Sequence, residues 1–172
     1  MNDNPAVVVL NKGVEPLNET HNRKGFDCGV PALNDFLQKF AGQKSNRNQA
    51  QTYVLSADDN ETIIGYFTLT MTRFNWHEIV GKKSKTVDTA ALIARLAVDK
   101  RFTGQGVGLF LLRTALEKLI IANDILGVPI IVVDAKDGVS AFYETVGFQF
   151  LEQGSSRLFI TMETILNSQK IK

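Results

Sequence analysis

The spacing of apolar residues predicts a helix near the start of the chain, over residues 31–43. Apolar residues recur there on one helical face: Leu33, Phe36, Leu37 and Phe40. Pro31 suits the first helical position, because an N–H there would have no helical partner. Residues 18–30 are polar and predict a loop. Residues 44–51 are also polar, so they form either a frayed extension of the helix or a loop.

A β-hairpin is predicted after this helix. Residues 52–56 are β-prone, residues 57–61 contain turn-forming Asp and Asn, and residues 63–72 alternate between two faces. Residues 73–90 show no strong periodicity and are predicted to be a variable loop. Ahead of the helix, residues 6–10 are apolar and are predicted to form a short strand.

The middle of the chain predicts a strand–helix–strand crossover. A nearly continuous apolar run over residues 92–98 predicts a strand, and leucines at helical spacing predict a helix over residues 107–122. Residues 130–133 are wholly apolar, as expected of a strand buried on both faces. Antiparallel pieces around this crossover predict a mixed α/β (α+β) fold.

The last part of the chain predicts one short helix and two strands. The helix covers residues 139–146 and ends at Gly147. The strands cover residues 148–151 and 158–162, and a Gly- and Ser-containing turn joins them.

Length and charge favour a single globular domain over residues 1–172. The chain is 44% hydrophobic and 22% charged, and its net charge is +1. This balance argues against a protein covered in positive charge for bulk binding of nucleic acid, but it leaves a local basic patch open.

Cysteine and membrane signals add little chemistry. Cys28 is the only cysteine, so no intrachain disulfide can form and a reducing compartment is expected. Two distant histidines, His21 and His77, give it neither a partner motif for a nucleophile nor a metal-ligand cluster. No apolar run approaches membrane-spanning length and residues 1–4 lack a basic signal-peptide start, so we expect cytoplasmic residence.

The strongest chemical signal is a glycine-rich turn between the strand at 92–98 and the helix at 107–122. Gly104, Gly106 and Gly108 keep side chains away from the backbone, and the helix start presents unpaired N–H groups and the positive end of its dipole. The turn therefore predicts a site for phosphate or pyrophosphate. It lacks the Gly-Lys-Ser/Thr of a P-loop and the spacing and position of a Rossmann turn.

The segment Arg101-Phe102-Thr103-Gly104-Gln105-Gly106 resembles the acyl-CoA pyrophosphate loop of GNAT N-acetyltransferases, R/Q-x-x-G-x-G/A. Further segments over about residues 14–165 resemble one branch, the GNAT toxins of bacterial toxin–antitoxin pairs. These segments are Phe26-Asp27-Cys28-Gly29, Leu33-Asn34-Asp35-Phe36-Leu37, Ile64-Gly65-Tyr66-Phe67, Ala94-Arg95-Leu96-Ala97-Val98-Asp99 and Phe142-Tyr143-Glu144 with Gly147-Phe148.

The resemblance implies a fold, a donor and a set of site residues. The fold is a central, mostly antiparallel twisted sheet with a β-α-β crossover that binds acyl-CoA, flanked by helices. The donor is acetyl-CoA, with no metal. The implied cofactor-binding residues are Leu96, Ala97, Val98, Arg101, Thr103, Gly104, Gln105, Gly106, Val107, Gly108 and Phe142. Tyr143 matches the tyrosine that donates a proton or hydrogen bond to the leaving sulfur.

The implied reaction is direct attack of an amine on the thioester, so it needs no Cys or Ser nucleophile. Glu144, Asp134 and His77 stay open as general bases. A strong base is not required for every acceptor. At pH 7 about one lysine side chain in two thousand is neutral, but roughly a tenth to a sixth of α-amino groups are.

The acceptor surface is less defined by the sequence. Arg95 interrupts an apolar strand, so it either pairs with a carboxylate or faces the acceptor and touches phosphate. The segment Arg73-Phe74 with Trp76 mixes charge and aromatic rings, which suits a nucleotide as well as a core. The remaining candidates for contact with tRNA phosphates are Lys44, Arg47, Lys82, Lys83 and Lys85.

Three functions remain after this comparison. The toxin branch implies acetylation of the α-amino group of aminoacyl-tRNA, inhibition of translation, a cognate antitoxin of ribbon-helix-helix type that binds operator DNA with the toxin, and a homodimer. A GNAT enzyme for a small amine or a protein N-terminus is the first alternative. A CoA-binding regulator without catalysis is the second, and the presence of Tyr143 weakens it.

Overall fold

The computed structural model describes residues 12–75 and 87–169. The chain divides into two compact units, each built from two stretches of sequence. The first unit comprises Met1–Leu69 and Arg95–Glu117, and the second comprises Thr70–Ala94 and Lys118–Lys172. The strand predicted over residues 6–10 lies outside the described residues.

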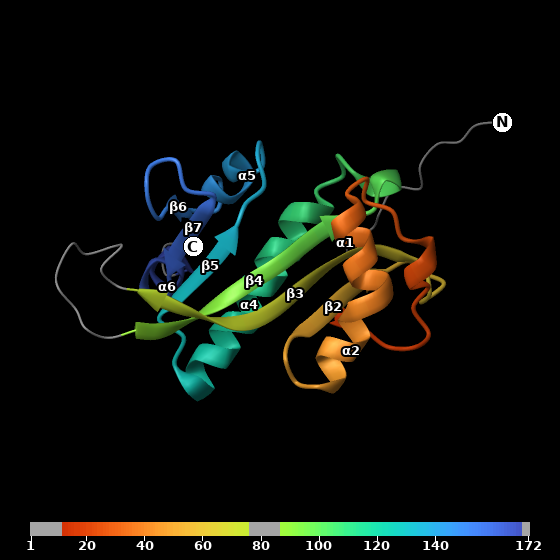
Figure 1. Cartoon of the computed structure of the whole chain (residues 1–172), viewed down its shortest axis with the longest axis horizontal. Coiled ribbons are helices and arrows are strands. Elements are labelled where there is room, and N and C mark those ends of the chain that lie inside the picture. Colours follow the sequence, from red (N-terminus) through yellow and green to blue (C-terminus); the bar gives the residue numbers. More distant parts are fainter. Residues whose placement is uncertain (1–11, 76–86, 170–172) are drawn as a thin grey trace. The chain divides into compact units, whose positions relative to one another are not determined.

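Seven strands form one sheet in the order β1-β2-β3-β4-β5-β7-β6 (Figure 1). The registers of β1–β2, β2–β3, β5–β7 and β6–β7 are antiparallel, whereas β4 and β5 run parallel. This confirms the mixed fold with a mostly antiparallel sheet and a central crossover. The strands are β1 Glu15–Pro16, β2 Gln51–Ser56, β3 Ile63–Asn75, β4 Val87–Val98, β5 Ile130–Asp134, β6 Gln149–Phe150 and β7 Arg157–Thr161.

The predicted N-terminal helix is present in the first unit, but one turn of it is π-helical. It consists of α1 (Pro31–Asp35), a π-helical segment (Phe36–Phe40) and α2 (Ala41–Asn46). The N–H of Ala41 bonds to the carbonyl of Phe36, five residues back, so the buried stripe continues at Ala41. Phe40, which the sequence placed on one face with Leu33, Phe36 and Leu37, is therefore off the buried stripe and is 48% exposed.

The helical segment and Phe26, which precedes it, pack on the β2–β3 hairpin through aromatic rings. Phe26 and Phe36 lie 5.4 and 6.4 Å from the ring of Tyr66, centroid to centroid. The Tyr66 hydroxyl is satisfied inside the protein, since it donates to the Leu33 carbonyl at 2.8 Å. Next to it, Gly65 admits the crossover helix, because a Cβ there would lie 2.7 Å from the Leu111 side chain.

The crossover helix is longer than predicted, running as α4 over Val107–Leu126. No helix within residues 12–75 and 87–169 has both the length and the apolar character needed to cross a membrane. The loop predicted over residues 73–90 is partly strand, since β3 extends to Asn75 and β4 begins at Val87. The rest of that loop lies outside the described residues.

The second unit contains the end of the sheet and two short helices. All of β5 except its last residue is buried, as predicted. The helix α5 covers Ser140–Glu144, and Gly147 follows it with φ of 103°. The helix α6, Met162–Gln169, was not expected from the sequence, which predicted a strand through Met162. It begins there because the Thr161 hydroxyl accepts the N–H of Thr164 at 3.1 Å and caps the first turn.

Candidate active site

The connection from β4 to α4 is held open by two glycines. After β4, a short 3-10 turn (Lys100–Phe102) leads into the glycine turn. Gly104 and Gly106 have φ of +75° and +78°, a conformation that disfavours any other residue. A Cβ on either would meet nothing within 4 Å, so the space in front of both is open. The turn is shaped to let a ligand approach the backbone.

The start of α4 supplies hydrogen-bond donors to this open space. The first bond that reaches back from the helix joins the N–H of Phe110 to the Gly106 carbonyl at 3.0 Å. The N–H groups of Val107, Gly108 and Leu109 precede it, at the positions that have no acceptor within a helix. With the positive end of the helix dipole, they form an anion site that suits a pyrophosphate.

The last residues of β4 lie beyond its register with β5. That parallel register covers Ala91–Ile93, whereas Leu96–Val98 continue further along the strand. Ala97 is buried, and its two neighbours are half-buried. The backbone edge at Leu96–Val98 is therefore outside the ladder that β5 forms with β4.

A buried carboxylate fixes the start of the turn. Asp99 is 1% exposed and accepts four hydrogen bonds, from the backbone N–H groups of Asp27 and Arg101 and from Nε and Nη2 of Arg101, at 2.8 to 3.0 Å. Burial alone would raise the pKa of Asp99, but the bonds from Arg101 and Asp27 outweigh it and lower the pKa. The carboxylate is therefore ionised and holds the Arg101 guanidinium in a two-pronged pair.

A second carboxylate extends this arrangement to the N-terminal segment. Asp27 pairs with Lys100 at 2.6 Å and accepts the N–H of Gly29 and the amide of Asn34, both at 2.9 Å. The bond from Lys100 comes first among the causes that hold the pKa of Asp27 well below its usual range. The backbone N–H of Lys100 also donates to the Asp27 carbonyl at 2.9 Å. We call Asp27 and Asp99 together the aspartate clamp.

Sequence reasoning missed the aspartate clamp. The available signal was an aspartate directly after an apolar strand, with an arginine two residues later. Such an Asp can cap the following turn and pair with the Arg at once, and Asp99 does both. The partnership with Asp27, 72 residues away, could not be seen without the fold.

The predicted catalytic tyrosine, Tyr143, differs from the buried Tyr66 in the surroundings of its hydroxyl. Tyr143 lies on α5 in the second unit, is 7% exposed, and packs edge-on against Phe142 and Phe148 at 5.1 and 5.8 Å. Its hydroxyl bonds to no described residue, unlike that of Tyr66. Among the described residues no buried side-chain oxygen or nitrogen lacks a partner. Burial of the ring raises the pKa of Tyr143 and keeps the phenol protonated.

The residues suggested for contact with the acceptor are only partly described. Arg95 pairs with no carboxylate in the described parts of the chain, and its guanidinium lies 3.6 Å from the centre of the Phe36 ring. Desolvation lowers the pKa of Arg95. Lys44 is exposed and donates to the side chain of Gln49 at 3.0 Å, and Arg47 is exposed at the end of α2. Trp76, Lys82, Lys83 and Lys85 lie outside the described residues.

The structure also describes most of the other candidate residues, among them those for stacking and for the general base. Phe74 is 3% exposed in the core of the second unit, so of the two interpretations left open for its segment, Phe74 fits the core. Asp134 is engaged by Arg157 through bonds of 2.7 and 2.9 Å, which disfavours it as a base. Glu144 is exposed, and His77 lies outside the described residues. The Cys28 thiol is half-buried, 3.2 Å from Oδ1 of Asn34. No group of three potential metal ligands occurs in the described parts of the chain.

Two curated relatives are similar over most of their length. The chain is 28% identical over 166 residues to the probable toxin TacT of Sinorhizobium fredii, covering 88% of this chain and 92% of the relative. It is also 28% identical over 142 residues to the tRNA-acetylating toxin of Mycobacterium tuberculosis, covering 80% of this chain and 84% of the relative.

Solved structures share the fold. AtaT complexed with acetyl-methionyl-tRNAfMet superposes with a TM-score of 0.82 at 23% identity, over 91% of this chain and 98% of that chain. An AtaT mutant bound to the C-terminus of antitoxin AtaR and acetyl-CoA gives 0.78 at 24% identity, over 91% and 97% of the two chains. The KacTA–DNA complex gives 0.78 at 26% identity, over 93% and 99%.

Residues 48–150 match the protein family described as the acetyltransferase (GNAT) domain. This region contains the glycine turn, the last residues of β4 and Tyr143. Because it covers more than half of the sequence, the chain belongs to the family of GNAT acetyltransferases.

Proposed function

We propose that this protein is a toxin that transfers the acetyl group of acetyl-CoA to the α-amino group of aminoacyl-tRNA and so blocks translation. The observation that carries the proposal is the similarity to a tRNA-acetylating toxin over 80% of this chain. The similarity to a probable toxin over 88% of the chain supports the same branch. Residues 1–172 would act as one acetyltransferase domain.

The glycine turn is the proposed site for the pyrophosphate of acetyl-CoA. The space in front of Gly104 and Gly106 fits the group, and the N–H groups at the start of α4 would donate to its oxygens. Thr103, Gln105 and Arg101 flank the same turn, and the aspartate clamp fixes its start. The backbone of Leu96–Val98 would pair with the pantetheine arm, since β5 does not occupy that edge.

Tyr143 is the proposed proton donor. As the acceptor nitrogen forms its bond to the acetyl carbon, the carbon–sulfur bond breaks and the sulfur gains negative charge. The Tyr143 hydroxyl has its proton and no bond within the described residues, so it can donate to this sulfur. The Phe142 ring beside it would border the donor. The attacking α-amine is already neutral, as a sizeable share of α-amino groups is at pH 7. Its nitrogen then loses one proton to water as the amide forms, and Tyr143 regains its proton from solvent.

The partners are proposed from the same branch. The solved relatives include an AtaT mutant bound to the C-terminus of antitoxin AtaR and a KacTA–DNA complex. We expect a cognate antitoxin of ribbon-helix-helix type that binds operator DNA together with this chain. A homodimer and cytoplasmic residence belong to the same proposal. Contacts with the tRNA would come from Arg95, Lys44, Arg47, Lys82, Lys83 and Lys85.

The proposal is tested by transfer of label from radioactive acetyl-CoA. Purified protein should label total charged tRNA, whereas uncharged tRNA should accept no label because it lacks the amine. A mixture of small amines and of peptides with free N-termini serves as the competing acceptor. Label on these acceptors with none on charged tRNA would contradict the proposal and favour a GNAT enzyme of another specificity.

A further inference from the structure

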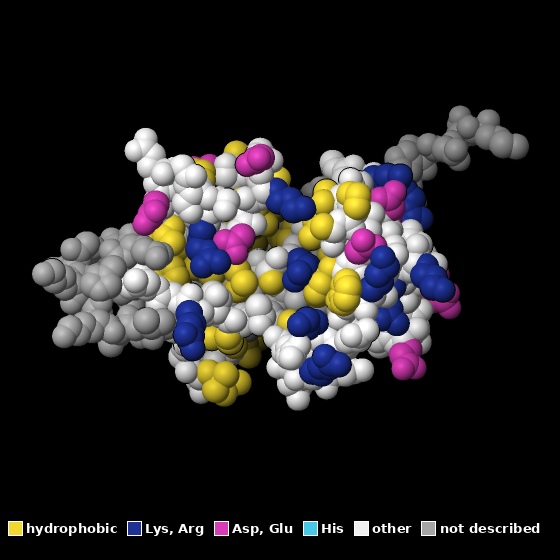
Figure 2. Space-filling model, in the orientation of Figure 1, with side chains coloured by type: hydrophobic (Ala, Val, Ile, Leu, Met, Phe, Trp, Pro, Cys, Tyr) yellow, Lys and Arg dark blue, Asp and Glu magenta, His cyan; other side chains and the backbone are white. Residues whose placement is uncertain are grey.

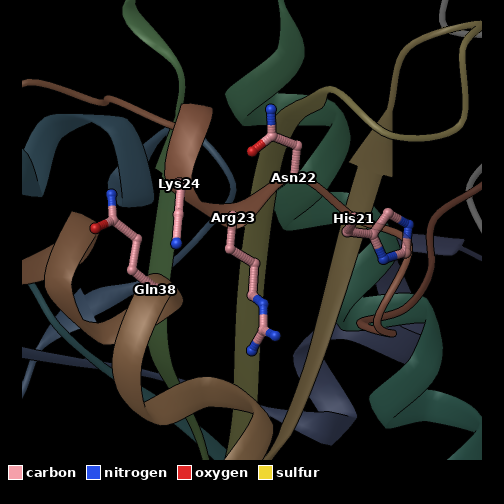
Figure 3. A pocket seen from close by; sticks show the side chains of 5 residues that line it. All are labelled: His21, Asn22, Arg23, Lys24 and Gln38. Carbon is pink, nitrogen blue, oxygen red and sulfur yellow. The ribbon is translucent and has the colours of Figure 1, made fainter.

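A basic pocket lies in the first unit, away from the residues assigned above. It measures about 230 Å³ and is lined by His21, Asn22, Arg23, Lys24 and Gln38 (Figure 3). Four of these residues lie on or next to a 3-10 turn, Arg23–Gly25, and Gln38 lies in the π-helical segment. None of these five side chains is acidic.

The two cations of the pocket have no acidic partner among residues 12–75 and 87–169. Figure 3 shows Arg23 and Lys24 pointing the same way from their turn, with Gln38 across from them on the helix. Lys24 is exposed and Arg23 is half-buried. Arg23 is seated against α2, because a Cβ on Gly42 would lie 3.0 Å from its Nη1 atom. Lys and Arg side chains are also frequent on the visible surface over α1 and α2 (Figure 2).

The neutral residues of the pocket differ in what they leave for a ligand. Gln38 leaves its Oε1 as an acceptor, because its Nε2 donates to the Phe26 carbonyl at 3.5 Å. The Oδ1 atom of Asn22 is used, since it accepts the N–H of Gly25 at 3.0 Å, and its amide N–H groups remain. Both ring nitrogens of His21 are engaged, by the N–H of Asn18 at 3.0 Å and by the carboxylate of Glu15 at 3.1 Å. The buried His21 therefore forms a wall of the pocket and has no ring nitrogen left to bind a ligand. A ligand with several acceptor oxygens and negative charge fits this set.

The turn that carries the cations is bonded to the 3-10 turn (Lys100–Phe102) that leads into the glycine turn. Nη2 of Arg101 donates to the Gly25 carbonyl at 3.4 Å, and the same atom bonds to Asp99 at 2.9 Å. The aspartate clamp joins the next residues of the segment to the same place, through the N–H of Asp27. The basic pocket and the proposed donor site thus share one hydrogen-bonded framework within the first unit.

We propose that Arg23 and Lys24 bind a phosphodiester group of the acceptor RNA in this pocket. The inference rests on the proposed function. The volume supports a group of this size, since pockets that enclose whole small molecules measure roughly 300–1,000 Å³. Phosphate contacts of this kind position a nucleic acid without reading its sequence. The pocket would hold the tRNA backbone while its charged end reaches the donor.

The test compares tRNA binding by charge-removing variants across salt concentrations. The variants are Arg23→Gln/Lys24→Gln and Lys24→Gln alone, and Lys39→Gln is the matched control. Lys39 is also an exposed lysine of the first unit, but it is paired with Asp35 at 2.7 Å. Dissociation constants for tRNA and for acetyl-CoA are measured between 50 and about 200 mM salt, the range over which phosphate contacts are salt-sensitive. Thermal unfolding checks that each variant folds.

Each lost phosphate contact should reduce the salt slope by about 0.9, which extrapolates to about eightfold weaker binding at 0.1 M salt. The double variant should lose at least one such contact, and Lys24→Gln should show a measurable part of the same loss in affinity and slope. Lys39→Gln should bind like wild type, and acetyl-CoA affinity should not change in any variant. If the double variant does not fold, Lys24→Gln at its exposed position decides the question.

Unchanged tRNA affinity and salt slope in the folded variants would overturn the inference. A loss of acetyl-CoA affinity in place of tRNA affinity would also overturn it, because the pocket would then hold a phosphate of the donor. Acetylation of charged tRNA by the wild type is measured in parallel. If the wild type acetylates it and the variants bind normally, only the pocket assignment fails, whereas an inactive wild type contradicts the proposed function itself.

Discussion

Replacing Asp99 with asparagine should loosen the glycine turn. The carboxylate accepts four hydrogen bonds, and three of the donors belong to Arg101. Each carboxylate oxygen accepts two of these bonds, so the amide nitrogen of an asparagine would face two donors and lose both bonds. The Asp99→Asn variant also leaves the Arg101 guanidinium without its charge partner.

The size of the effect follows from these bonds. A hydrogen bond to a charged group contributes about 1.5–3 kcal/mol, and about two such bonds are lost. Arg101 is half exposed, so solvent screens its side of the pair and we take about 2–3 kcal/mol. For a chain of this length, that lowers the unfolding temperature by roughly 4–12 °C. Because the turn is no longer fixed, acetyl-CoA should also bind more weakly.

Asp59→Asn is the matched control. Asp59 also accepts backbone N–H groups, those of Glu61 and Thr62, at 2.9 and 2.8 Å, and hydrogen bonds led by that of the Thr62 side chain lower the pKa of Asp59 to about 2. It is exposed and lies in the β2–β3 turn, so the same chemical change should leave acetyl-CoA affinity intact. Circular dichroism follows unfolding and calorimetry follows binding. An Asp99→Asn protein that unfolds and binds acetyl-CoA like wild type would refute the role of the aspartate clamp.

The same carboxylate sets an acid limit on stability. The pKa of Asp99 is lower in the folded protein than in the unfolded chain, so its contribution is complete above about pH 4, the ordinary value for Asp. The contribution disappears as the pH falls further, through the folded pKa. Between neutral pH and acid, Asp99→Asn should therefore lose less stability than wild type, as measured by urea unfolding at several pH values.

Three further substitutions have distinct expected results. Tyr143→Phe should slow acetyl transfer by about 10²–10⁴-fold with donor affinity unchanged. Tyr66→Phe should instead cost about 1–3 kcal/mol of stability and leave the rate per folded molecule unchanged. Equal rates for wild type and Tyr143→Phe would make Tyr143 a packing residue. Gly106→Glu should abolish binding of acetyl-CoA in a folded protein by placing a carboxylate at the pyrophosphate, and retained affinity in calorimetry would reject the assignment. Gly65→Ala should destabilise by about 1–3 kcal/mol, because the added methyl group meets atoms under 3 Å away, and an unchanged unfolding temperature would contradict this.

The sequence predicted the elements whose pattern is local. The crossover from β4 through α4 to β5 was predicted because the buried parallel strands are continuous apolar runs and the helix has leucines at helical spacing. The glycine turn was predicted because the conformational role of Gly104 and Gly106 is local to the positions that they occupy. The position of Tyr143 came from resemblance and has no periodic signal of its own.

The features that the sequence did not predict depend on contacts between residues distant in the sequence. The π-helical turn moved the buried stripe from Phe40 to Ala41, and no spacing rule anticipates it. The seating of Arg95 on Phe36 joins residues that are far apart in the chain, so two readings of Arg95 stayed open. The basic pocket likewise pairs the turn at Arg23–Gly25 with Gln38, and the sequence showed only a polar loop there.

The most direct test of the proposed function locates the acetyl group on its acceptor. Charged tRNA is incubated with acetyl-CoA and the protein, digested with nuclease, and the aminoacyl-adenosine ends are analysed by mass spectrometry. The account predicts one acetyl group on the α-nitrogen of the amino acid, formed by wild type and greatly reduced with Tyr143→Phe. Aminoacyl-adenosine without an acetyl group, from a protein that binds acetyl-CoA and acetylates other amines, would contradict it.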